Sequence, residues 1–296
     1  MRAVLPVLLL AGCGLDVGTT AEWFDAESVT GVLAPDLGGL NRSLPVPMGS
    51  GDVFRVVSFN VEMGGDAELL ATEIRANAAI ADAPLFLIQE QEGYPDEGMS
   101  RARKLAQQLD LAYAYIPGRI KKTGTHGLSL MSRFPIENID VMLLPLTDGG
   151  QQRIAISADV VIGETRLRVV NVHLETHINI TDRIVHFRPA VIDLPHQVLV
   201  AGDVNTNPYL WEEGSVPLVP TAQIVDTDQA PLLDDYMRAI GFDTPASDIG
   251  PTERMYGVES RLDAIYTRGL SVSKAKVERT VGGSDHWPVW LDVTLP

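Results

Sequence analysis

The sequence predicts a single α+β domain, and three features of its 296 residues indicate this fold class. Short apolar runs and alternating stretches, which are typical of strands, are separated by segments with apolar residues at helical spacing. Strand patterns dominate the middle of the chain instead of alternating regularly with helices. The composition shows neither repeats nor a second zone, and 45% hydrophobic residues suffice for a substantial core.

Taken in order, the patterns predict a strand over residues 53–59 and a helix over 66–81. A second strand is predicted over 85–88 and a second helix over 100–109, with Ser100 as its N-cap. The later strands are predicted over 113–116, 127–132, 139–144, 154–161, 167–174, 198–201, 262–267 and the alternating run that ends at Leu295. The later helices are predicted over 181–191 and 232–240, and a hairpin turn over 162–165.

The N-terminal segment resembles a bacterial lipoprotein signal. Met1-Arg2 is a short basic start, residues 4–10 form an apolar run too short to anchor the chain across a bilayer, and Leu10-Ala11-Gly12-Cys13 resembles a lipobox. The resemblance implies cleavage before Cys13, lipidation of that cysteine, and export to the outer membrane or cell surface. We therefore predict a signal peptide over 1–12, lipidated Cys13 with a flexible tether over 13–51, and the domain over 52–296. The alternative is an incidental buried cysteine.

Charge and cysteine content exclude several kinds of function. Cys13 is the sole cysteine, so neither an intrachain disulfide nor a thiolate zinc site can form. The net charge of −16, from 23 basic and 39 acidic residues, repels polyanions and argues against a nuclease that coats a duplex. A bound divalent ion can still capture one phosphate locally.

Polar residues stand at the ends of several predicted strands. Asn60, Glu90 and Asp203 each follow an apolar run, whereas Asp285 and His286 precede the last one. Strand ends hold such side chains rigidly where a substrate can reach them. Carboxylate and amide oxygens suit magnesium, and an aspartate beside a histidine is a common device for orienting the ring.

Six short motifs resemble, in type and order, those of the endonuclease/exonuclease/phosphatase superfamily of metal-dependent phosphoesterases. They are Phe59-Asn60, Ile88-Gln89-Glu90, Asn171-Val172-His173-Leu174, Gly202-Asp203-Val204-Asn205, Arg261-Leu262-Asp263 and Ser284-Asp285-His286. The resemblance spans about residues 53–295. It implies a four-layer sandwich, in which two packed, mostly antiparallel sheets are flanked by helices.

The resemblance also implies roles for individual residues. Glu90 corresponds to the principal metal ligand, supported by Asn60 and Asp285, for Mg²⁺ or Mn²⁺. The catalytic residues that it implies are His173, Asp203, Asn205, Asp263 and His286. In that set, Asp263 orients His286, and His173 is a donor to the phosphate. Asp203 either activates water or protonates the leaving group, and the sequence does not divide these roles.

Residues for substrate contact are marked less clearly. Where many nucleases of the family carry Tyr or His, this chain has Thr125, with His126 beside it. A basic cluster stands just before that position. We therefore predict substrate contacts from Arg119, Lys121, Lys122 and His126. The alternative is a solvated hairpin tip.

Taken singly, each polar residue also has a structural interpretation: a solvated strand end for Glu90, a core histidine for His173, an Asx turn for Asp203 and a sheet-edge charge for Asp263. The ordered set favours an exported, lipid-anchored, divalent-metal-dependent phosphoesterase, nuclease-like and acting as a phosphodiesterase. The first alternative is a phosphatase or sphingomyelinase-like hydrolase, and another is a non-catalytic binding lipoprotein. The expected partners are a phosphoester (nucleic acid, lipid headgroup or small phosphate) and a membrane, with no protein partner predicted.

Overall fold

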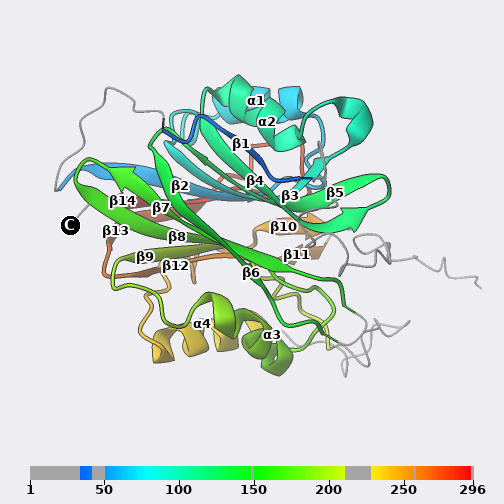
Figure 1. Ribbon diagram of the computed structural model, residues 1–296. Coiled ribbons are helices and arrows are strands. Elements are labelled where there is room, and N and C mark those ends of the chain that lie inside the picture. The colour runs from blue at the N-terminus through cyan, green and yellow to red at the C-terminus, as the bar shows by residue number, and fades with distance from the viewer. Residues whose placement is uncertain (1–33, 42–50, 148–149, 211–227, 256–257, 295–296) are drawn as a thin grey trace, which may run out of the picture.

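The computed structural model describes residues 34–41, 51–147, 150–210, 228–255 and 258–294. Within them the chain forms four layers (Figure 1). Helices α1 (Ala67–Ala76) and α2 (Arg101–Leu109) cover the outer face of a seven-stranded sheet, and α3 (Ile180–Phe187) and α4 (Gln229–Ala239) cover that of a five-stranded sheet. The predicted four-layer sandwich is confirmed. Cys13 and the signal-like segment lie outside the described residues.

Both sheets are antiparallel except for one parallel pair each, β2–β3 and β8–β9. The larger sheet contains, in order, β1 (Asp36–Gly38), β4 (Ala112–Lys121), β5 (Gly124–Ser132), β3 (Leu85–Gly93), β2 (Val53–Asn60), β14 (Val289–Thr294) and β13 (Ser271–Val277). The smaller sheet contains β12 (Asp263–Arg268), β9 (Val198–Asp203), β8 (Thr165–His173), β7 (Ile154–Ile162) and β6 (Ile136–Leu143). Strands β10 (Glu253–Met255) and β11 (Val258–Ser260) form a separate two-stranded sheet. Two short 3₁₀ helices are η2 (Pro95–Glu97) and η3 (Arg188–Ala190).

Strand β2 shows why the layers stack as they do. Its side chains alternate between two apolar cores: Phe54 and Val56 pack between the two sheets, while Val57 and Phe59 pack under α1 and α2. This two-residue period lets one strand bury both of its faces. A third apolar core lies between the smaller sheet and the helices α3 and α4, and it includes Phe187.

Several element boundaries differ from the prediction. Helix α1 ends before Asn77, whose side chain accepts the N–H of Ala79 at 2.9 Å and so offers the backbone an alternative to the helix. Strand β13 was not predicted; it pairs only with β14 at a sheet edge, and most of its side chains are partly or fully exposed. Strand β1 lies within the segment interpreted as a tether, and its Asp36 accepts hydrogen bonds from Ser100 and Tyr113. By contrast, Ser100 caps α2 as predicted.

The two parallel strand pairs bring their polar ends to one region. Asn60 ends β2 and Glu90 lies near the end of β3, whereas His173 and Asp203 end β8 and β9 in paired register. Because an antiparallel neighbour begins where its partner ends, β12 begins at Asp263, directly opposite Asp203. Residues that are far apart in the sequence therefore converge.

Gly202 is required for the close approach of β8 and β9. Its φ is 152°, and a Cβ at this position would lie 1.9 Å from the carbonyl oxygen of Val172. We expect Gly202→Ala to lower the free energy of unfolding by roughly 2–4 kcal/mol, because both overpacking and backbone strain oppose it. Urea denaturation measures this change. Gly98→Ala is the control, since Gly98 also has a positive φ but open space around it; equal losses in the two variants would contradict the steric explanation.

Candidate active site

Glu90 reaches the site through a β-bulge. The register between β3 and β5 shifts between Ile88 and Gln91, and Glu90 takes a left-handed backbone conformation with φ 58°. Such bulges re-aim a side chain and are common at functional sites. Burial opposes the ionised form of Glu90, but its contacts with His126, His173 and Asn60 hold the pKa of this carboxyl well below its usual range. Glu90 is therefore a buried carboxylate at neutral pH.

Asn60 joins carboxylates from the two sheets. Its Nδ2 donates to Glu90 Oε1 at 3.2 Å and to Asp203 Oδ2 at 2.9 Å. Its Oδ1 accepts the backbone N–H of Glu62 at 3.1 Å, which fixes the orientation of the amide. Asn60 is almost fully buried, so these contacts are shielded from water.

Asp263 and His286 form the imidazole–carboxylate pair. Nδ1 of His286 lies 2.8 Å from Asp263 Oδ2, and its Nε2 lies 3.8 Å from Asp203 Oδ2. Burial alone would lower the pKa of His286, but the charge of Asp263 and its hydrogen bond raise this pKa well above the usual range of histidine. The ring is therefore a cation at neutral pH, with Nδ1–H donating to Asp263.

Asp203 differs from its neighbours in its protonation. Burial raises its pKa to about 7, an effect that nearby His286 opposes and Asp263 reinforces. Its Oδ1 accepts the N–H of Asn205 at 2.8 Å, which is the Asx turn that the sequence left open, while its Oδ2 faces Asn60. A pKa near the working pH suits a group that exchanges protons during a reaction. Asp203 thus serves both the turn and the site.

Acidic side chains gather beside Glu90. Burial and the charges of Asp285 and Glu90 raise the pKa of Glu62, and burial with the charge of Glu90 raises that of Asp285. Glu253 is buried and bridges to His286 through the backbone, and burial raises its pKa to about 7. A divalent ion would relieve such mutual repulsion, and the carboxylate oxygens of Glu90 and Asp285 are of the kind that suits Mg²⁺ or Mn²⁺. The assignment of Glu90, Asn60 and Asp285 as metal ligands stays a prediction, and the Asn60 amide turns its nitrogen, not its oxygen, toward Glu90.

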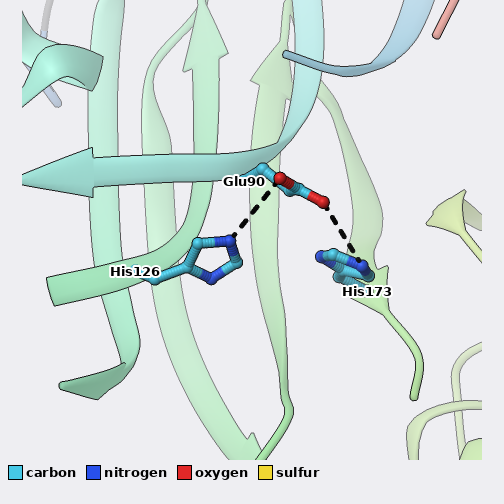
Figure 2. A group of neighbouring side chains, drawn as sticks. All are labelled: Glu90, His126 and His173. Carbon is cyan, nitrogen blue, oxygen red and sulfur yellow. Dashed lines mark ion pairs between the residues drawn. The ribbon is translucent and has the colours of Figure 1, made fainter. Parts of the chain in front are cut away.

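Two imidazoles face Glu90, His126 from the adjacent strand β5 and His173 from β8 of the other sheet (Figure 2). His126 Nε2 lies 3.8 Å from Glu90 Oε2, and His173 Nε2 lies 3.9 Å from Glu90 Oε1. Burial lowers the pKa of His126 to about 4 and that of His173 well below its usual range, so both rings are neutral near pH 7. His173 Nε2 also lies 3.4 Å from Asp203 Oδ2. The structure therefore places His173 and His126 side by side at the centre of the site.

The loop after Asp203 is held by a buried arginine. Arg183, on α3, is fully buried and donates to the carbonyl oxygens of Glu175 at 2.6 Å and Val204 at 3.0 Å, and to that of Ile178 at 2.7 Å. The side-chain Nδ2 of Asn205 donates to the carbonyl oxygen of Leu174 at 2.9 Å. These bonds join the ends of β8 and β9 to the helix and fix the loop that carries Asn205.

The predicted basic cluster divides into buried and exposed residues. Lys121 is buried and pairs with Glu92 at 2.8 Å. Arg119 is also buried, directly opposite His126 in the register of β4 and β5. Lys122 is exposed at the β4–β5 turn. Of these residues His126 contacts Glu90, and the charges of Arg119 and Lys121 both act on His126.

Sequence reasoning missed several residues that support the site. Between the two sheets, Gln89 Nε2 on β3 donates to Asn171 Oδ1 on β8 at 2.7 Å, and this buried hydrogen bond links the sheets. Both residues occur in the motifs, yet no local pattern marks a contact across sheets. Glu62 and Glu253 stand in segments with no such motif, and a single sequence carries no signal that brings them to the site.

Glu175 should make stability depend on pH in the acid range. Burial alone would raise its pKa, but the charge of Arg153 at 3.2 Å and the N–H groups of Gln151 and Thr176 lower it to about 2, from 4.5. A lowered pKa stabilises the fold above pH 4.5, and this contribution is lost as pH falls from 4.5 toward 2. The full contribution is about 3 kcal/mol.

We therefore expect Glu175→Gln to flatten the fall in the free energy of unfolding below pH 4.5, measured by urea denaturation at a series of pH values. Glu164→Gln, at the exposed β7–β8 turn, serves as the control. Identical pH dependence in wild type and Glu175→Gln would contradict the assignment of the acid-sensitive contact to Glu175.

Comparisons with known proteins agree with this geometry. A model described as the Endonuclease/Exonuclease/phosphatase family matches residues 57–286. Among solved structures, an endonuclease/exonuclease/phosphatase from Beutenbergia cavernae DSM 12333 is similar, with a TM-score of 0.62 and 18% identity over 82% of this chain and 72% of that one. A family protein from Leptotrichia buccalis C-1013-b has a TM-score of 0.61 and 14% identity, over 82% and 100% of the two chains.

The endonuclease domain of TRAS1, a telomere-specific non-LTR retrotransposon, has a TM-score of 0.52 and 16% identity, over 82% of this chain and 99% of that one. At these identities the likeness concerns the fold. The comparison with curated proteins gives no match.

Proposed function

Because the chain belongs to the endonuclease/exonuclease/phosphatase family, we propose that it hydrolyses phosphoesters with the aid of a divalent metal ion. The observation that carries this proposal is the convergence of Glu90, Asp203 and the Asp263–His286 pair at the strand ends of two packed sheets. These groups supply a metal ligand, a proton-exchanging carboxyl and a cationic donor within one buried cluster. Phosphoester hydrolysis needs all three.

The chain's own residues divide the work in the following way. His286, held as a cation by Asp263, donates from Nε2 to a phosphoryl oxygen and balances the charge that grows there. Asp203 Oδ2 exchanges the proton, taking it from the attacking water or giving it to the leaving oxygen. Asn60 orients both Asp203 and Glu90. Glu90 and Asp285, with Asn60 beside them, would hold Mg²⁺ or Mn²⁺, and the ion would supply polarisation of the phosphoryl group.

For the substrate, we propose a phosphodiester, as expected for a nuclease-like enzyme. The family assignment and the endonuclease domain among its structural neighbours support this proposal. The net charge of −16 favours the second candidate, a phosphatase or sphingomyelinase-like hydrolase of a small or lipid phosphoester, because it repels polynucleotides. The proposed contacts to the phosphate are His126, next to Glu90, and Arg119, opposite His126 on β4.

The test is hydrolysis by the full chain with Mg²⁺ or Mn²⁺. The substrates are bis-p-nitrophenyl phosphate, p-nitrophenyl phosphate, DNA, RNA and sphingomyelin, each with and without EDTA. We expect metal-dependent cleavage of a diester that Glu90→Ala abolishes and Glu164→Ala, at an exposed turn, retains. Cleavage of the monoester alone would favour a phosphatase. Absence of turnover by a folded, metal-binding chain would favour the third interpretation, a binding lipoprotein.

We further propose that the protein is a lipoprotein anchored through Cys13 and exported to the outer membrane or cell surface. The lipobox-like sequence Leu10-Ala11-Gly12-Cys13 supports this proposal. In the described part of the chain, no helix is long and apolar enough to span a membrane. Cell fractionation after lipid labelling tests the anchor: the label should appear on wild type and not on Cys13→Ser. Recovery of the wild type solely in the soluble cytoplasm would refute it.

A further inference from the structure

We propose that Glu253 determines substrate specificity, because its carboxyl accepts a hydrogen bond from a protonated amine that the substrate carries beside its phosphate. Glu253 takes no part in the division of work proposed above. The inference rests on the proposed function, since it assumes that His286 holds the phosphate. It deepens that function by naming an aminoalkyl phosphodiester as the substrate class. Binding of such a compound can nevertheless be measured without hydrolysis.

A short antiparallel bridge places Glu253 directly opposite His286. Two backbone hydrogen bonds flank this pair: Trp287 N–H donates to the Thr252 carbonyl oxygen at 2.7 Å, and Arg254 N–H donates to the Asp285 carbonyl oxygen at 3.0 Å. A pair flanked in this way is the closer kind of antiparallel pair, with its two Cα atoms about 4.5 Å apart and both side chains on one face. Glu253 and His286 therefore extend from the backbone to the same side.

Thr252 fixes this bridge to the start of β12. Its Oγ1 accepts the N–H groups of Leu262 and Asp263, each at 3.0 Å. Asp263 in turn lies 2.8 Å from His286 Nδ1. One network of hydrogen bonds therefore sets the position of Glu253 relative to the Asp263–His286 pair, and a residue that selects a substrate needs such support.

The Glu253 carboxyl is buried, with 4% of the residue exposed. Within the described parts of the chain, no group donates a hydrogen bond to this side chain. His286 does not supply the donor, because its Nδ1 is directed to Asp263, at 2.8 Å, and its Nε2 lies 3.8 Å from Asp203 Oδ2. Buried polar groups are nearly always hydrogen-bonded, and burying one without a partner is unfavourable. A substrate that brings a donor to Glu253 therefore gains an interaction that the described residues leave open.

The charges around Glu253 favour a cationic donor. Burial raises the pKa of Glu253 to about 7, an effect that the charge of His286 opposes and those of Asp285, Asp203 and Asp263 reinforce. Carboxyls thus outnumber the single cation in these surroundings, so an ammonium group is favoured over a neutral hydroxyl and a second phosphate is disfavoured. The net charge of −16 acts in the same direction. An aminoalkyl phosphodiester meets both conditions, because it carries one phosphate charge and one amine charge.

The experiment compares aminoethyl p-nitrophenyl phosphate with propyl p-nitrophenyl phosphate, using the full chain with Mg²⁺. The propyl ester has nearly the same shape but lacks the amine. We expect the kcat/KM of the aminoethyl ester to be about 10- to 100-fold higher, the range given by a hydrogen bond to a charged group. Glu253→Gln should lower this ratio by about 10-fold while hydrolysis of the propyl ester persists. Glu259→Gln, at an exposed position on β11, is the control and should keep the wild-type ratio.

Glu253→Asp is the second variant if the glutamine variant does not fold. It keeps the charge but withdraws the carboxyl by one methylene, so the ratio should fall here too. Vesicles of a lipid with an aminoethyl phosphate headgroup form another arm of the experiment. Faster hydrolysis of the lipid than of the soluble ester would assign the amine to a lipid headgroup, and the reverse would assign it to a small diester.

A wild-type ratio near one, or the same ratio in wild type and Glu253→Gln, would overturn the inference. Equal hydrolysis of both esters that Glu90→Ala abolishes would still leave the proposed function standing. Binding of aminoethyl phosphate and propyl phosphate is measured by calorimetry on the same preparations. Tighter binding of the aminoethyl compound that depends on Glu253, without hydrolysis of either ester, would support the inference and count against the proposed function. Equal binding without hydrolysis would contradict both.

Discussion

Replacing Asp263 with Asn should lower kcat by about 10⁴-fold at neutral pH, the size of loss known when a catalytic histidine loses its orienting carboxylate. Asp263 Oδ2 accepts from His286 Nδ1 at 2.8 Å, and its charge raises the pKa of His286 well above the usual range. Without that charge, the buried ring loses its proton at neutral pH and can take the wrong tautomer. The loss is measured with the diester substrate under saturating metal.

The pH profile distinguishes this electrostatic role from simple unfolding. In wild type, the raised pKa keeps His286 protonated through neutral pH; in Asp263→Asn, the pKa falls, so protonation requires more acid. The ratio of variant to wild-type activity should therefore rise as pH is lowered from 8 toward 5. Asp182→Asn, at an exposed position on α3, is the control. A constant ratio, or a loss below 10-fold, would contradict the proposed role of the pair.

Arg183→Met should produce the largest loss of stability among single substitutions near the site, about 3–5 kcal/mol in the free energy of unfolding. The guanidinium is fully buried and binds the carbonyl oxygens of Glu175, Val204 and Ile178. Burial lowers its pKa to about 9, so the group is still charged at neutral pH. Methionine fills much of the volume but leaves these buried acceptors without their donor.

Urea denaturation measures this loss of stability, and two further variants show whether it comes from the hydrogen bonds of Arg183. Arg183→Lys keeps the charge but not the planar fork of donors, so its stability should lie between wild type and Arg183→Met. Arg188→Met changes an exposed arginine five residues later and should shift the free energy of unfolding by less than about 0.5 kcal/mol. Because Val204 lies between Asp203 and Asn205, Arg183→Lys should also lower kcat. Equal stabilities for Arg183→Met and Arg188→Met would contradict the role of Arg183.

Site residues that are marked by a local sequence pattern could be predicted, whereas residues placed by contacts between distant segments could not. Glu90 and Asp203 could be proposed because each follows an apolar run, and strand ends are visible in local patterning. The position of Lys121 could not be foreseen in the same way, because its buried partner, Glu92, lies on β3, with β5 between the two strands. Likewise, Arg183 has the sequence signature of a surface helix, and only the loops packed over α3 explain its burial.

The sequence by itself determined the class of fold, the order of most strands and helices, and the polar residues at the strand ends. These follow from short-range periodicity, which needs no knowledge of partners. Only the tertiary structure decided which residues meet: the bulge that turns Glu90, the cross-sheet bond of Gln89 to Asn171, and the approach of His126 to His173. Such contacts depend on register and on packing between sheets, and these join residues far apart in the chain that no local pattern relates to one another.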